Sequence, residues 1–201
     1  MALRTHSVLV VPAHGHCDAD GRYDHGQRYG RFSQMDVVDG YMHSLIDELD
    51  GDGVRHEVMP TRTHPGVCAQ DRPRFVEANH LVLHLCAGFS QDPPKTKNMT
   101  SVYYGSPQAR DIAEEISEAI AEWGHCYVWG HKTANPQLSS DPLLQVKGSL
   151  GVRIEPFVLN GPDSDLYLAK LPQLGTCIGR ALVGYLTHRG HARARGVVTL
   201  A

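Results

Sequence analysis

The segment Ser7-Val-Leu-Val-Val-Pro-Ala-His14 determines how the rest of the chain is interpreted. Its apolar run is typical of a buried strand, and the polar His14 comes just after the proline that ends the run. Similar apolar runs occur at 80–85 and 152–159, with amphipathic helical segments between them. This alternation predicts an α/β fold: a single domain with a mostly parallel twisted sheet and helices on both faces.

Helices are expected where apolar residues recur at intervals of three and four. Such spacing occurs at 35–49, 106–123 and 171–186. The other expected elements are strands at 54–59, 101–104 and 126–129 and a short helix at 72–78. Stretches rich in Gly, Pro or polar residues at 13–32, 91–100 and 132–141 are expected to be loops. The first of these is long, which is typical of a functional loop.

The size and composition of the chain are those of one globular domain. The chain has 201 residues, of which 41% are hydrophobic and 20% are charged, and its formal net charge is −3. This charge gives no indication of a nucleic-acid partner. We expect a domain over residues 1–187 and a basic tail over 188–201. The oligomeric state is left open.

The sequence also bears on the compartment. The first six residues form no long apolar stretch, so we expect no secretory signal peptide and synthesis in the cytoplasm. The chain contains no apolar run of about 18 residues, so no membrane span is expected. Its five cysteines are odd in number and include no C-x-x-C pair, which argues against a disulfide framework.

Three polar residues are expected at or near the carboxyl ends of strands. His14 follows the first strand, His84 lies at the end of the run 80–85, and Glu155 lies within the run 152–159. Ligands of open α/β sheets bind at this edge. Imidazoles are common zinc ligands, and a carboxylate whose pKa is raised by burial can act as the general base. The interpretation is therefore a zinc-hydrolase type of site.

Structural roles are the alternative for each of these residues. A single histidine at the end of a strand is often only hydrogen-bonded in place. Glu155 could instead form an ion pair with Arg153, two residues before it. The shared placement near strand ends is what favours the functional interpretation.

Several motifs occur in a set order along the chain. Residues 11–16 read VPAHGH, 57–62 read EVMPTR, 72–79 read RPRFVEAN and 83–87 read LHLCA. In this order they resemble D-P-G-H-G-G, E-V-x-x-T-R, an arginine-containing helix with A-N, and S-I-H-A-N. These are motifs of the catalytic domain of the zinc-dependent N-acetylmuramoyl-L-alanine amidases of the type-3 family.

The resemblance continues to the end of the domain. Residues 102–106 read VYYGS, similar to the Y-Y-x-S segment that precedes a helix in the family. Residues 152–160 read VRIEPFVLN, similar to V-L-V-E-T-G-F-x-S-N but one residue shorter and without its Gly. Residues 163–186 resemble the closing helix. The resemblance thus covers most of the chain and implies the family's fold.

The resemblance also implies roles for residues. It makes His14 and His84 ligands of Zn²⁺ and gives Glu155 the proton transfers of catalysis. The family's third ligand is a Glu at the start of the first long helix, and this position falls on Gln34. A glutamine offers a neutral carbonyl oxygen without the charge that favours Zn²⁺. The substitutes open in the loop and first turn are His16, Asp24, His25 and Asp36.

The function that the resemblance implies is zinc-dependent hydrolysis of the N-acetylmuramoyl-L-alanine amide bond, with peptidoglycan as the partner and the cell wall as the place of action. A phage-type lysin released at lysis, or a part carried by a larger particle, would fit the absence of a signal peptide. One alternative is an inactive relative that binds the wall or serves a structural role, which Gln34 favours. Another is a different metal-dependent amidohydrolase, which the His14-x-His16 pair favours.

Overall fold

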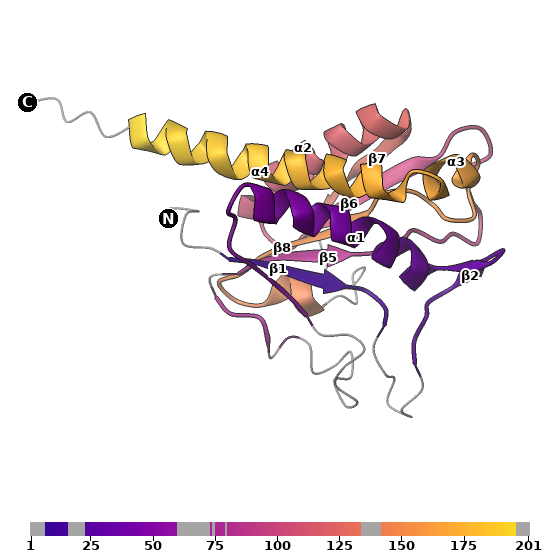
Figure 1. Ribbon diagram of the computed structural model, residues 1–201, viewed down its shortest axis with the longest axis horizontal. Helices are drawn as coiled ribbons and strands as arrows, with labels where there is room; N and C mark the ends of the chain where they lie inside the picture. The colour runs from indigo at the N-terminus through magenta and orange to yellow at the C-terminus, as the bar shows by residue number, and fades with distance from the viewer. Residues whose placement is uncertain are drawn as a thin grey trace, which may run out of the picture.

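The sheet at the centre of the molecule has six strands in the order β4-β1-β5-β8-β6-β7 (Figure 1). The computed structural model describes residues 7–15, 23–59, 73, 75–78, 80–133 and 142–195. The strands are β1 (Ser7–Pro12), β4 (His56–Val58), β5 (His80–Leu85), β6 (Met99–Tyr104), β7 (Tyr127–Thr133) and β8 (Leu150–Glu155). A separate hairpin is formed by β2 (Arg28–Tyr29) and β3 (Phe32–Ser33).

The sheet is parallel except at one pairing. β4, β1, β5 and β8 run in the same direction, and β7 is parallel to β6. β6 pairs with β8 in the antiparallel direction, with Ser101 opposite Glu155. The predicted α/β class and mostly parallel sheet are therefore confirmed. One consequence matters for the site: β6 begins at the edge of the sheet where β8 ends.

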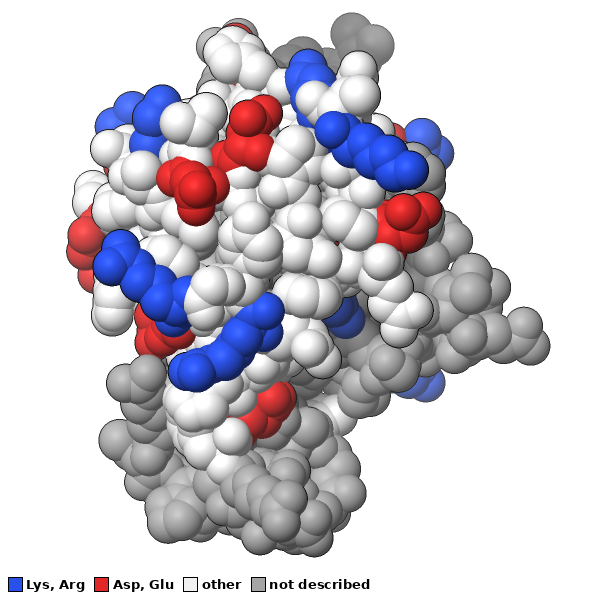
Figure 2. Space-filling model, turned by 90° about the vertical axis from the view of Figure 1, so that its right-hand side faces the viewer, with Lys and Arg blue, Asp and Glu red and all other residues white. Residues whose placement is uncertain are grey.

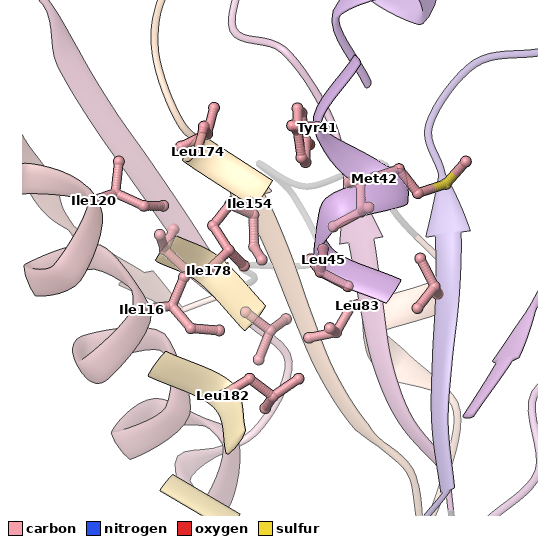
Figure 3. Packing of buried hydrophobic residues seen from close by; sticks show 14 of the residues in the cluster. Tyr41, Met42, Leu45, Leu83, Ile116, Ile120, Ile154, Leu174, Ile178 and Leu182 are labelled. Carbon is pink, nitrogen blue, oxygen red and sulfur yellow. The ribbon is translucent and has the colours of Figure 1, made fainter. Parts of the chain in front are cut away.

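Three long helices cover one face of this sheet. The helices are α1 (Gln34–Gly51), α2 (Pro107–Gly124), α3 (Ser164–Leu168) and α4 (Leu171–Arg195), with a 3₁₀ helix, η3, at Pro142–Gln145. α4 lies between α1 and α2, so Ile178 packs among side chains of both helices and of the sheet (Figure 3). The buried positions of α1 and α2 follow the predicted helical spacing.

The opposite face of the sheet has a smaller core in the described part of the chain. Alternate strand residues such as Val11 and Val82 point there and pack with Leu143 of η3. The prediction had helices on both faces, whereas α1, α2 and α4 all share one. Apolar spacing shows that a helix has a buried side, but it does not show which face of the sheet that side meets.

Several predicted boundaries differ from the structure, and two of the differences have a clear physical cause. β8 ends at Glu155 instead of running to 159, because Pro156 has no N–H to donate to a neighbouring strand. α4 continues to Arg195, so the backbone of the expected tail at 188–201 is helical over its first residues. Alanine and arginine favour helix, which explains the continuation. No helix in the described ranges is long and apolar enough to cross a bilayer.

Candidate functional site at the carboxyl edge

The carboxyl ends of β1, β5 and β8 form one edge of the sheet. Pro12 is opposite Leu85, and Leu85 is opposite Ile154. The ladder extends one step further, because Ala13 N–H donates to Leu85 O at 2.8 Å and Cys86 N–H donates to Ile154 O at 2.9 Å. His14 and Cys86 therefore follow the ends of two neighbouring strands, and Glu155 forms the end of the third. Figure 2 shows this side of the molecule, where basic and acidic side chains are interspersed on the described surface.

The His14 imidazole is held by a carboxylate. Its Nδ1 lies 2.8 Å from Asp24 Oδ2. Asp24 is fixed in turn, since its Oδ1 accepts from Gly26 N–H at 2.8 Å and its backbone O accepts from Gly15 N–H at 2.8 Å. A carboxylate acceptor favours the tautomer with the proton on Nδ1, which leaves the Nε2 lone pair available. His14 thus presents Nε2 as a base or ligand.

Gln34 is the first residue of α1, and its amide is hydrogen-bonded at both ends. Its Oε1 accepts from Gln27 N–H at 2.8 Å, and its Nε2 donates to the carbonyl of Ala87, just beyond β5. The amide therefore links the loop before α1 to the segment after β5. An acidic side chain at this position could not donate the second bond, so the glutamine has a structural role that a glutamate could not fill.

His14 and Gln34 meet at Gly26. A Cβ on this glycine would lie 2.8 Å from His14 Nε2 and 2.7 Å from Gln34 Oε1. Gly26 also has φ +69°, a conformation that glycine adopts readily. The missing side chain allows this loop to approach both side chains closely, so the imidazole and the amide both lie beside Gly26.

His84 is placed differently. It lies within β5, buried, on the sheet face that also carries Val82, whereas Leu83 and Leu85 point toward the helices. Its neighbour across the ladder is Arg153 of β8.

Glu155 is the last residue of β8, on the sheet face that also carries Arg153 and His84, and it is paired. Arg153 Nη2 donates to Glu155 Oε1 at 2.7 Å, and the Arg153 guanidinium lies 6.0 Å from the centre of the Tyr103 ring. Burial raises the pKa of Tyr103, and the nearby Glu155 charge raises it further. Tyr103 therefore stays a neutral phenol beside this ion pair.

A second tyrosine closes the site from the helix side. Tyr41 OH donates to Cys86 O at 2.8 Å, and the side chain is fully buried. Burial raises the pKa of Tyr41 well above its ordinary value, with Cys86 and Glu155 adding to the shift. The helical spacing predicted Tyr41 only as a core residue. Nothing in the sequence indicated its hydrogen bond to the backbone at the end of β5.

The substitutes for the third ligand have other partners. Asp24 holds His14, and Asp36 accepts from Ser33 N–H at 2.8 Å as part of the α1 cap. The ring of His25 contacts Tyr23 at a centroid distance of 4.5 Å. His16 lies outside the described residues, as do Thr61 and Arg62 of the second motif.

Taken together, these donors fall short of a catalytic zinc site, which normally has three protein ligands. His14 offers one imidazole nitrogen, and Gln34 offers one neutral oxygen that already accepts an N–H. Over the ranges that the structure describes, no three His, Cys, Asp or Glu side chains are grouped to hold a metal ion. The roles predicted for His14, Gln34, His84 and Glu155 stay predictions.

The fold is shared with solved amidase structures. N-acetylmuramoyl-L-alanine amidase AmiC2 of Nostoc punctiforme has a TM-score of 0.72 at 19% identity, over 90% of this chain and 97% of that one. The catalytic domain of the CD27L endolysin targeting Clostridia difficile gives 0.69 at 14% identity, over 89% and 97%. Ami1, the N-acetylmuramyl-L-alanine amidase from Mycobacterium smegmatis, gives 0.63 at 18% identity, over 94% and 97%.

No protein-family model matches the sequence, and a search of curated proteins finds no match. The similarity is thus one of fold. The chain has the fold of N-acetylmuramoyl-L-alanine amidase catalytic domains, as the resemblance predicted.

Proposed function

We propose that this protein acts on peptidoglycan at the cell wall and hydrolyses the amide between the lactyl group of N-acetylmuramic acid and L-alanine. The fold supports this, because the similar structures include enzymes named for this amide. The observation that carries the proposal is the Asp24-bound His14, whose Nε2 lies with the Gln34 Oε1 beside Gly26 at the carboxyl edge. Such a convergence of oriented polar groups is typical of a reaction centre.

The proton transfers of the reaction are assigned to Glu155. Hydrolysis adds water to the amide carbonyl, breaks the C–N bond and transfers a proton to the leaving nitrogen. A carboxylate can accept the proton from water and return it to the nitrogen. Arg153 holds this carboxylate at 2.7 Å and so fixes its orientation. His14 Nε2 would position the substrate.

Zinc dependence is a separate prediction, made from the resemblance. Because the described residues do not complete a three-ligand set, we assign no step of the reaction to a metal. Elemental analysis of gently purified protein tests this prediction. About one zinc per chain, reduced in His14→Ala, would support it, and a metal-free active protein would contradict it.

A second candidate function is binding to the wall without hydrolysis. Gln34 favours it, because both ends of its amide are engaged in hydrogen bonds to the backbone. A residue that serves as a structural link in this way is less suited to contact a reacting group. The fold would then serve as a surface for peptidoglycan.

The experiment that separates these functions compares Glu155→Gln with Glu118→Gln. Glu118 is an exposed position of α2 and serves as the control. Turbidity of a cell-wall suspension measures hydrolysis, and cosedimentation measures binding. We expect Glu155→Gln to lose about 10²–10⁴ in rate and to keep binding, because the amide is nearly isosteric. If Glu155→Gln hydrolyses the wall as fast as the parent, Glu155 is not the proton-transfer group. If the parent binds the wall but causes no loss of turbidity, the second candidate function is favoured.

A further inference from the structure

A pocket of about 310 Å³ lies between the end of α2, α3 and the start of α4. Its polar lining comprises Lys97, Lys170, His125 and Asp163. None of these residues takes part in the site around His14 and Glu155. The pocket therefore has a chemistry of its own that the proposed reaction does not explain.

This pocket opens at the same edge of the sheet as the candidate site. Lys97 precedes β6, which starts at that edge because it is antiparallel to β8. Met99 pairs with Tyr127, and Tyr127 N–H donates to Asn98 O at 3.0 Å.

The backbone around the pocket is held in an uncommon conformation. Among the described residues, the non-glycine residues with positive φ are His125 at 50° and Asp163 at 58°, and both line this pocket. His and Asp tolerate this conformation better than most residues, but it still has a conformational cost. Strain of this kind often marks functional positions.

The charges of the lining select for a single negative charge. The lining contains two lysines and one carboxylate, that of Asp163, which leaves an excess of positive charge. Lys97 is partly buried, with its Nζ 4.7 Å from the centre of the Tyr127 ring. A monoanionic carboxylate balances this charge, whereas a phosphate dianion would leave an excess.

The remaining wall is aromatic and apolar. The ring centroids of Trp123 and Tyr167 are 6.0 Å apart. Leu166, which also lines the pocket, has 62% of its surface exposed. Burial raises the pKa of Tyr167 to about 12, so its phenol is neutral at physiological pH, and its OH donates to Gly124 O at 2.8 Å. This wall suits the methyl groups and backbone of a short peptide.

We propose that this pocket binds the terminal carboxylate of a short peptide. Lys97 and Lys170 would contact the carboxylate, and Trp123 with Leu166 would contact the last side chain. The inference rests on the proposed function only in identifying this peptide as part of the substrate. Binding of a free peptide acid does not depend on hydrolysis.

The test is a titration of the full chain with acetyl-trialanine and with its C-terminal amide, followed by NMR of the Trp123 indole. Lys97→Gln and Lys170→Gln are the test variants. Lys147→Gln is the control, because Lys147 is exposed and precedes β8 at the opposite edge. We expect the acid to bind at least about tenfold more tightly than the amide, and each test variant to lose most of that preference.

Several outcomes would overturn the proposal. These are equal affinity for acid and amide, no Trp123 shift at millimolar peptide, a preference that survives in both test variants, or inorganic phosphate binding as tightly as the acid. If a test variant is misfolded by circular dichroism, the comparison of acid with amide on the unaltered protein still decides. If the protein binds the peptide but does not hydrolyse the wall, the binding role of this pocket is supported and only the proposed reaction is refuted.

Discussion

The helix-covered face of the sheet and its carboxyl edge are stabilised by different kinds of contact. On the covered face, residues such as Leu45, Ile116 and Ile178 are fully buried and pack against one another. At the edge, segments distant in sequence are joined by side chains that bond to backbone. Gln34 reaches the carbonyl of Ala87, and Tyr41 reaches that of Cys86.

This difference shows that the contacts that stabilise the fold are distinct from those that position the polar groups of the site. The covered face depends on many similar apolar contacts, so many sequences would serve there. The edge depends on a few hydrogen bonds, each of which sets the position of one polar group. Substitutions in the first region should therefore change stability, and those in the second should change activity first.

The largest effect is expected for Gly175→Ala in α4. A Cβ at Gly175 would lie 2.0 Å from Tyr41 O, so the backbones of α1 and α4 would have to separate. We expect the free energy of unfolding to fall by about 3 kcal/mol, the upper end for overpacking. Gly184→Ala in the same helix has open space around its Cβ and is expected to raise stability by about 0.5–1 kcal/mol. Urea unfolding measures both, and equal effects would show that this helix contact is not tight.

The next effect concerns the edge. Gly26→Ala would place a Cβ between His14 Nε2 and Gln34 Oε1, and we expect the hydrolysis rate to fall by about 10²-fold, the loss typical of a misplaced reacting group. Gly30→Ala is the matched control, because its φ is also positive at 57° but no atom lies near its Cβ. Both variants share a backbone cost of about 1–2 kcal/mol, visible in thermal unfolding. Similar rates for the two would mean that the geometry at Gly26 is irrelevant to the reaction.

The smallest effect concerns Asp36, which caps α1 next to Gln34. Hydrogen bonds from the Ser33 backbone and hydroxyl lower the pKa of Asp36 below its ordinary value of 3.8. The stabilisation from a lowered pKa is present above that value and is lost as the pH falls through the folded-state pKa. Asp36→Asn should therefore destabilise the protein by about 0.5–1 kcal/mol at pH 7 and by progressively less as the pH falls below 3.8.

Unfolding curves at pH 7 and at a pH below 3.8 measure this change in the free energy of unfolding. Asp47→Asn, an exposed position of the same helix, is the control. The link to this carboxylate would be contradicted if the difference in unfolding free energy between Asp36→Asn and the parent stayed the same at both pH values.

Much of the fold could be predicted from the sequence. The run 80–85 forms β5 as expected, and the helical spacing of 35–49 lies within α1. The antiparallel β6 could not be predicted, because a strand's sequence does not carry its direction. The hairpin of β2 and β3 is only two residues on each strand, too short for a periodic signal.

The candidate site was less accessible to sequence reasoning. Proximity to a strand end indicated His14 and Glu155, and the spacing of Arg153 and Glu155 gave their ion pair as an alternative that the structure contains. The Asp24 contact to His14 could not be predicted, because it depends on how a long loop folds back. His84 looked similar to His14 in the sequence, but strand alternation directs it to the face opposite the helices.

The most direct test of the central claim is to identify the bonds cut in purified peptidoglycan. The protein is incubated with the polymer, and new amino termini and new reducing sugar ends are labelled and identified by mass spectrometry. The account predicts that L-alanine amino termini accumulate while reducing ends do not. New reducing ends, or no new termini from a folded protein that cosediments with the polymer, would contradict it.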